Sequence, residues 1–201
     1  MSATNELLWA LIGLLLTIFG TFMEVFIADP ISTPPWQWTE QAISVHSLGI
    51  SYQIGAVLIT GCLGGKNAGA ISQIAYLILG LYFLPVFAKG GELDYIQEPT
   101  FGYILGFIPG AWLCGWLAFR RKAKIEYLVF SSVVGLIAIH LVGMVYLVGL
   151  SLLNFIRNGI EPLGYLRETI MVYSIANFPA QLILVCLVSA IAYLIRIVLV
   201  Y

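Results

Sequence analysis

The feature that most constrains this chain is a series of apolar runs of membrane-spanning length, separated by short polar stretches. A helix that crosses a bilayer needs roughly 20 mostly apolar residues. The chain of 201 residues is 61% hydrophobic and 9% charged, which is more apolar surface than one soluble core can bury. The sequence therefore predicts an integral membrane protein.

Six runs meet this requirement, so we predict an all-α integral membrane protein: a six-transmembrane-helix bundle forming a single domain over residues 1–201. The expected spans are residues 7–27, 47–63, 67–84, 99–119, 127–150 and 169–199. The last run is long and contains Pro179, which lacks a backbone donor and is expected to kink or interrupt the helix.

The basic residues predict the orientation, because cytoplasmic loops retain Lys and Arg. Four of the nine lie together between the fourth and fifth spans: Arg120, Arg121, Lys122 and Lys124. With this loop in the cytoplasm, both termini are cytoplasmic and the loop between the third and fourth spans faces outward.

The residue types argue against catalysis and against a bound metal or cofactor. No H-E-x-x-H or G-x-S-x-G pattern occurs, and the three cysteines lie singly in apolar runs. The formal net charge of -1 offers no basic stripe for nucleic acid. We expect neither an enzyme nor a nucleic-acid-binding protein.

The loop between the third and fourth spans has more defined chemistry than a plain connection requires. It begins with Leu84-Pro85-Val86-Phe87-Ala88-Lys89-Gly90-Gly91 and continues, after a polar gap, with Glu98-Pro99-Thr100-Phe101-Gly102-Tyr103-Ile104-Leu105-Gly106-Phe107. Prolines, a glycine pair and several rings between two membrane spans indicate a site that faces incoming solute.

A second candidate site feature is a polar column in the sixth span. Tyr173, Asn177 and Gln181 are spaced by four and share one helix face. Polar side chains at membrane depth face the protein interior, since facing lipid leaves them unsatisfied. The column is expected to line a pocket together with Gln53 of the second span, although hydrogen bonding between helices is the alternative for each residue.

The two halves of the loop resemble the LPVFAxGG and PT-x-GYLxGF signature of the BioY family, and Ile50-Ser51-Tyr52-Gln53 resembles its TLQ-type element. Members of that family are S components of energy-coupling-factor (ECF) importers. The resemblance implies a six-helix S component in the plasma membrane that binds biotin from outside. It also implies a coupling transmembrane subunit and paired ATPase subunits as partners, with no cofactor in the S component itself.

The chain departs from the family in the last helix, where an acid and a lysine of a P-G-D-x-x-K element usually contribute to the biotin site. Here Pro179 is followed by Gln181 and Leu184 at the two charged positions. A glutamine amide can match both a donor and an acceptor of the ureido ring. The carboxylate of biotin then needs Lys89 or the helix that starts at Pro99.

On the first span, the family commonly uses a small-residue motif to dock the coupling subunit. Ala10, Gly13, Thr17 and Thr21 form a relaxed version of such a stripe. Small residues at this spacing also allow two helices of one bundle to approach closely. The stripe therefore fits either docking or internal packing.

We therefore predict biotin uptake. The expected polar contacts are Gln53, Lys89, Tyr103, Asn177 and Gln181, with apolar walls from Tyr82 and Phe87. Three alternatives remain open: an S-like transporter for another small solute, an intramembrane enzyme using Glu24 or His140, and a structural membrane subunit.

Overall fold

The computed structural model describes residues 3–28, 45–159 and 161–199. Its main elements in chain order are α1 (Ala3–Phe22), β1 (Glu24–Ala28), β2 (Val45–Ser51), α2 (Gln53–Tyr82), α3 (Phe101–Ala118), α4 (Ile125–Asn158), α5 (Pro162–Ile170) and α6 (Phe178–Val198). A 3-10 helix (Leu93–Gln97) precedes α3, and a π-helical turn (Met171–Ile175) joins α5 to α6. Within the described residues, five helical stretches are long and apolar enough to cross a membrane.

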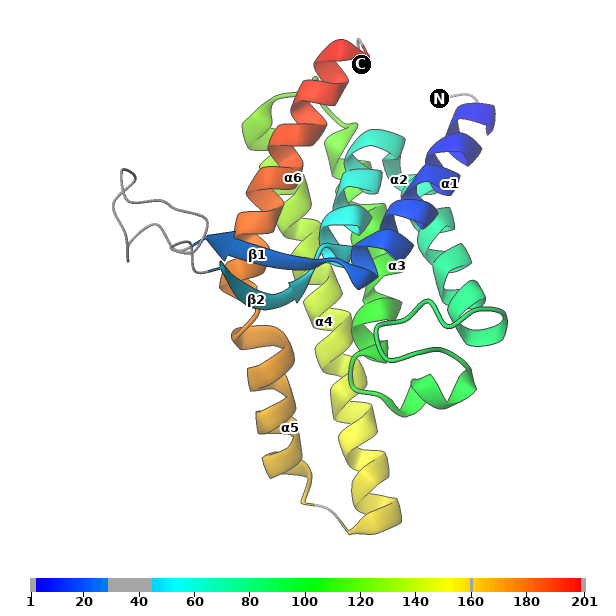
Figure 1. Cartoon of the computed structure of the whole chain (residues 1–201), viewed down its shortest axis with the longest axis vertical. Helices are drawn as coiled ribbons and strands as arrows, with labels where there is room; N and C mark the ends of the chain where they lie inside the picture. The colour runs from blue at the N-terminus through cyan, green and yellow to red at the C-terminus, as the bar shows by residue number, and fades with distance from the viewer. Residues whose placement is uncertain (1–2, 29–44, 160, 200–201) are drawn as a thin grey trace.

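Helix α2 is a helical hairpin, with two arms that run in opposite directions (Figure 1). The break falls at Gly65, whose φ of 78° and ψ of -176° form a backbone conformation that favours glycine. The arms correspond to the second and third predicted spans, and the turn falls within the short polar stretch between them.

The outer parts of the first two predicted spans are strands instead of helix. Strands β1 and β2 pair antiparallel, with Glu24 opposite Ser51 and Ala28 opposite Val45. Helix α1 therefore ends at Phe22, and α2 begins at Gln53. At 1.5 Å per residue the first arm of α2 is roughly 18 Å long, shorter than the ~30 Å hydrocarbon core. The β-hairpin formed by β1 and β2 lies across the bundle at mid-height (Figure 1).

The last predicted span is interrupted. After α4 ends at Gly159, which has a φ of 67°, the chain turns and α5 starts with Pro162 in its first turn. The π-helical turn and Asn177 separate α5 from α6, and Pro179 lies in the first turn of α6. The proline thus begins a new helix, where its missing N–H costs no hydrogen bond.

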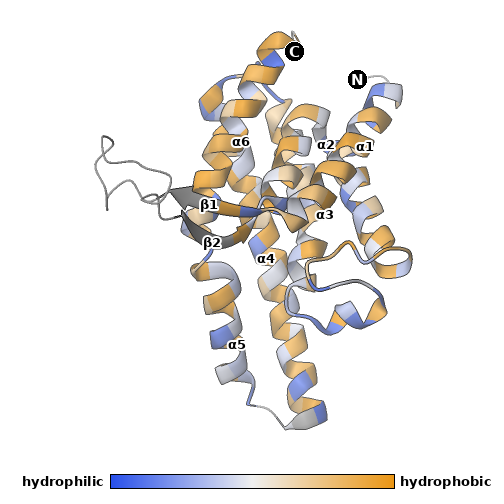
Figure 2. Ribbon diagram, viewed as in Figure 1, coloured by the Kyte–Doolittle hydropathy of each residue, from blue (hydrophilic) through white to orange (hydrophobic). Residues whose placement is uncertain are grey.

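The core lies between α2, α3, α4 and α6, around buried Leu58, Tyr76, Phe107, Leu136 and Val185. Figure 2 shows hydrophobic residues over the helices and hydrophilic residues concentrated at helix ends and in the α2–α3 connection. Both chain ends lie at the same end of the bundle (Figure 1). Large apolar side chains also cover its outside, as expected for contact with lipid: among them are Leu7, Leu11, Phe19, Leu141, Val145, Ile183 and Leu194.

Candidate functional site

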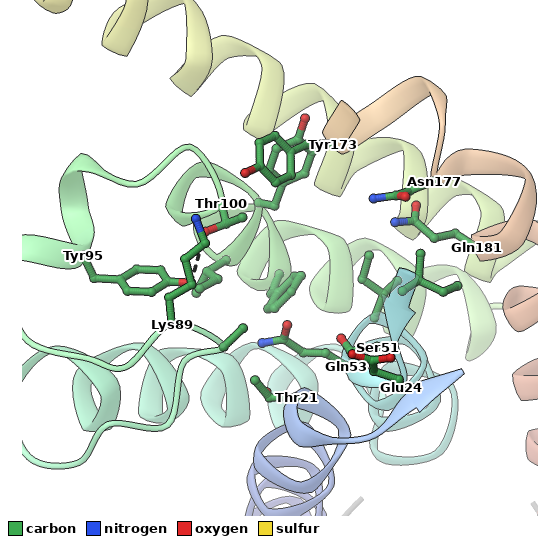
Figure 3. Close-up of a pocket in the computed structure, with 16 residues that line it drawn as sticks. Thr21, Glu24, Ser51, Gln53, Lys89, Tyr95, Thr100, Tyr173, Asn177 and Gln181 are labelled. Carbon is green, nitrogen blue, oxygen red and sulfur yellow. Dashed lines mark hydrogen bonds between the residues drawn. The ribbon is translucent and has the colours of Figure 1, made fainter. Parts of the chain in front are cut away.

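A cavity of about 310 Å³ lies beside the α2–α3 connection, within the size range of small-molecule sites. Six parts of the chain form it: the end of α1, the β-hairpin, the start of α2, the connection, α3 and the α5–α6 junction (Figure 3). Its polar and aromatic lining residues are Thr21, Glu24, Ser51, Gln53, Lys89, Tyr95, Thr100, Tyr103, Phe107, Tyr173, Asn177 and Gln181.

The α2–α3 connection reaches this cavity through a tight turn. The backbone groups of Phe87 and Gly90 exchange hydrogen bonds of 2.8 and 3.0 Å, which leaves Ala88 and Lys89 at the tip. Gly90 has a φ of 110°, and a Cβ on Gly91 would lie 2.7 Å from the Gly80 carbonyl oxygen. The glycine pair is therefore needed for the shape of the turn that presents Lys89.

Lys89 supplies a cation at one end of the cavity. Its Nζ lies 2.8 Å from Glu98 Oε2, and both side chains are partly exposed. The hydrogen bond to Glu98 raises the pKa of Lys89 above its usual value. The ammonium group is therefore charged at neutral pH and can attract an anion.

A series of aromatic rings in mutual contact packs around Phe87, at the start of the turn that presents Lys89. The ring centroid of Phe87 lies 5.3 Å from that of Tyr76 and 4.7 Å from that of Tyr95. The ring centroids of Tyr95 and Phe101 are 6.4 Å apart. Tyr95 Oη also lies 3.0 Å from Thr100 Oγ1 (Figure 3). Burial raises the pKa of Tyr95, so its hydroxyl remains a neutral hydrogen-bonding group.

Tyr76, fully buried on the second arm of α2, holds three parts of the site together. Its hydroxyl donates to the Val86 carbonyl oxygen at 2.9 Å and accepts from Gln53 Nε2 at 2.8 Å. Thr21 Oγ1 of α1 lies 3.0 Å away. One hydroxyl thus fixes the loop, the first residue of α2 and the end of α1 relative to one another.

On the opposite side, the α5–α6 junction brings Tyr173, Asn177 and Gln181 to the cavity, as the spacing of four predicted. Figure 3 shows Asn177 and Gln181 side by side, across the cavity from Lys89 and Tyr95. Gln181 Oε1 lies 2.6 Å from His140 Nε2 of α4. His140 Nδ1 lies 3.1 Å from Ser174 Oγ, which is 2.6 Å from Tyr103 Oη.

The structure separates the predicted site residues into two groups. Five line the cavity: Gln53, Lys89, Tyr103, Asn177 and Gln181. Tyr82 does not, because its side chain is 67% exposed at the end of α2. Phe87 is buried behind the lining, where it packs against Tyr76 and Tyr95, so it supports the wall without forming it.

The predicted docking stripe on α1 faces the inside of the molecule. Ala10, Gly13, Thr17 and Thr21 are all buried. A Cβ on Gly13 would overlap Thr60 of α2, and Thr17 Oγ1 accepts from Gln73 Nε2 at 3.1 Å. The stripe is thus the face that packs α1 against α2, and α2 covers it within the chain.

Sequence reasoning did not assign Tyr95 or Thr100 to the cavity, nor the buried Ser174 behind it, and it assigned Thr21 to the docking stripe alone. Tyr95 and Thr100 lie within the connection that carried the motifs, so proximity to those motifs was a usable signal. Ser174 has no such signal, because its contacts come from helices distant in sequence.

Two alternatives lose support from the geometry. Glu24 lines the cavity, whereas His140 faces a separate apolar cavity of about 410 Å³ beside α4 and the π-helical turn. The two ionisable residues proposed for an intramembrane enzyme therefore do not share a lining. A cavity under the α2–α3 connection also argues against a purely structural bundle.

Comparison with known proteins identifies a matching family and several relatives of this chain. A model of the BioY family matches residues 2–200. An uncharacterized 21.2 kDa protein of Cyanophora paradoxa is 28% identical over 191 residues, covering 94% of both chains. The biotin transporter BioY of Thermotoga maritima is 35% identical over 116 residues, which is 57% of this chain and 64% of that protein.

A solved structure has the same fold. The S-component for biotin from an ECF-type ABC transporter matches 98% of this chain and 94% of that one, with a TM-score of 0.65 and 21% sequence identity. The two chains thus share one fold over almost their whole lengths. Since the family model matches nearly the whole sequence, this chain belongs to the BioY family.

Proposed function

We propose that the protein is the substrate-binding S component of an ECF-type importer and that its ligand is biotin. The observation that carries the proposal is the cavity itself: the loop with the family motifs supplies a cation at one end, and two amides lie at the other. Relatives of this chain in Thermotoga maritima and Lysinibacillus sphaericus are named as a biotin transporter and a probable biotin transporter.

The chemistry of the lining suits the two ends of biotin. The carboxylate is expected at Lys89, where it gains a charge-assisted hydrogen bond. The ureido ring, with two N–H donors and a carbonyl acceptor, is expected near Asn177 and Gln181. Tyr103, Phe107 and Ile104 supply ring and aliphatic surface between these ends.

For the membrane topology, we propose six crossings, with the two arms of α2 counted separately and α5 and α6 forming the last. Both termini and the Arg120–Lys124 segment then lie in the cytoplasm, and the α2–α3 connection lies outside. The location of both chain ends at one end of the bundle supports this assignment (Figure 1). Labelling of single cysteines at exposed positions 121 and 93 by a membrane-impermeant reagent tests it: only the second is expected to react from outside.

The proposed partners are a coupling transmembrane subunit and ATPase subunits in the plasma membrane. The chain contains no complete G-x-x-x-x-G-K-[ST] nucleotide-binding motif, so inward transport needs energy from another subunit or from a gradient. Co-purification of tagged protein with such subunits from its native membrane, followed by ATP-dependent uptake in vesicles, checks this part of the proposal.

The decisive experiment for the ligand is equilibrium binding of labelled biotin to protein purified in detergent. Saturable binding below micromolar concentration is expected, with competition by unlabelled biotin and none by thiamine. Absence of binding at micromolar biotin refutes the assignment. Lys89→Met serves as the site variant, and Leu93→Ala, an exposed change outside the lining, as its control.

The residue at position 181 favours one second candidate, a transporter for a related solute. Gln181→Asp tests it: a gain in biotin affinity indicates that the present site is tuned to another ligand. A lysine at position 184 is unsuitable for this test. Leu184 is buried against Gly55 and lies outside the lining, so a cation there would be desolvated.

A further inference from the structure

Four polar side chains, two in the cavity wall and two behind it, form one continuous chain of hydrogen bonds. It runs from Tyr103 of α3 to Ser174 of the π-helical turn (2.6 Å), then to His140 of α4 (3.1 Å) and to Gln181 of α6 (2.6 Å). Tyr103 and Gln181 line the central cavity, but His140 does not. All four side chains are buried, so each contact is made away from bulk water.

The contact between His140 and Gln181 determines which groups of the amide remain available. An amide oxygen only accepts hydrogen bonds, so His140 Nε2 must carry the proton and donate to Gln181 Oε1. This holds for the neutral and the charged imidazole alike. With the neutral ring, Nδ1 accepts from the Ser174 hydroxyl, which in turn accepts from the Tyr103 hydroxyl.

The consequence is a fixed polarity at the α6 end of the site. With its oxygen directed at His140, Gln181 presents the N–H donors of its amide to the cavity. Tyr103, whose proton points toward Ser174, offers lone pairs. A free glutamine could rotate its amide to suit either kind of ligand group. Reversing it here would place two donors against each other unless the His140 proton moved to Nδ1 and the Ser174 and Tyr103 hydroxyls reversed as well.

We propose that His140 is a positioning residue that orients the Gln181 amide, so that the site selects ligands presenting a hydrogen-bond acceptor to α6 and rejects those presenting a donor there. For biotin this acceptor is the ureido carbonyl oxygen. The inference rests on the proposed function and extends it, since it assigns the orientation of the ligand and names a residue outside the lining as a determinant of specificity.

The test compares two ligands in one site. In 2-iminobiotin the ureido carbonyl oxygen is replaced by a nitrogen that is protonated at neutral pH, so a donor replaces the acceptor. Wild-type protein should prefer biotin over 2-iminobiotin by roughly 100-fold or more, because two donors would face each other. Desthiobiotin keeps the ureido ring and should bind without this loss.

Variants at position 140 separate positioning from general stability. His140→Leu frees the amide to rotate, so the preference for biotin should fall about tenfold or more. His140→Gln keeps an N–H donor near the position of Nε2 and should retain most of the preference. Ser131→Ala, a buried change elsewhere on α4 that removes a hydroxyl donating to the Tyr127 carbonyl oxygen of the same helix, is the matched control. An unchanged ligand ratio in folded His140→Leu overturns the inference.

A second readout does not depend on the ligand. Nitrogen-15 histidine spectra of the unliganded protein should show the His140 ring protonated at Nε2, with that signal altered in Gln181→Leu. A ring protonated only at Nδ1 refutes the proposed polarity even if biotin binds. Conversely, an Nε2-protonated ring together with absent biotin binding refutes the proposed ligand while leaving the orientation of Gln181 intact.

Discussion

Replacing Tyr76 by phenylalanine tests whether one buried hydroxyl aligns the site. The change keeps the ring that packs against Phe87 and removes the contacts to Thr21, Gln53 and Val86. Each net hydrogen bond is worth about 0.5–1.5 kcal/mol, and a buried group left unpaired costs about 1–3 kcal/mol. We expect the free energy of unfolding to fall by roughly 2–4 kcal/mol.

The effect on binding should be smaller, because the cavity can hydrate the freed Gln53 amide. A loss of about 1–2 kcal/mol corresponds to biotin affinity that is roughly 5–30-fold weaker. Isothermal titration calorimetry in detergent measures it, alongside a thermal unfolding curve. Tyr82→Phe is the matched control, since this tyrosine of the same helix is exposed and lies outside the lining.

A double-mutant cycle with Gln53→Leu identifies the route of the effect. If Tyr76 acts by orienting Gln53, the two losses in binding free energy should not add. Full additivity, or affinity within twofold of wild type for folded Tyr76→Phe, contradicts the reasoning that the hydroxyl aligns the site.

Three further predictions concern the loop, its cation and the bend in α2. Gly80→Ala places a Cβ against the Phe87 ring and should lower stability by about 1–3 kcal/mol; in the control Gly149→Ala the Cβ meets open space, and an equal loss there would contradict the packing argument. Lys89→Met should abolish a roughly tenfold preference for biotin over its uncharged amide, a difference of about 1.4 kcal/mol. Because the hydrogen bond to Glu98 raises the pKa of Lys89, its charge is lost only at higher pH, so in wild type this preference should stay constant between about pH 6 and 9; a decline within that range argues against Lys89. Gly65→Ala forces a side chain into a backbone conformation with a φ of 78° and should cost about 1–3 kcal/mol in thermal unfolding; an unchanged melting temperature would mean that the bend tolerates a Cβ.

The helices were predictable where a single local signal defined them. The fourth predicted span, 99–119, is close to the observed α3 at Phe101–Ala118, because Pro99 and Arg120 bound an uninterrupted apolar run. The first span was predicted too long. A short apolar run such as 24–28 fits a strand as well as a helix turn, and its pairing with 45–51 depends on residues distant in sequence.

The candidate site was also predictable only where a local sequence signal defined it. A spacing of four placed Tyr173, Asn177 and Gln181 on one face, and this survives in the structure because the π-helical turn and the new helix still direct all three to the cavity. Tyr82 was predicted as an apolar wall of the pocket, but its side chain is exposed at the end of α2 and lies outside the lining.

By itself, the sequence determined that this protein is membrane-embedded, where its turns fall and which loop carries the family motifs, since apolar run length, proline and glycine act locally along the chain. Only the tertiary structure decided that the small-residue stripe of α1 packs inward and that Tyr76 joins the loop to Gln53. It also decided that His140 holds the oxygen of Gln181. These contacts join residues up to 56 positions apart, and the direction of a buried hydrogen bond depends on partners that no local pattern specifies.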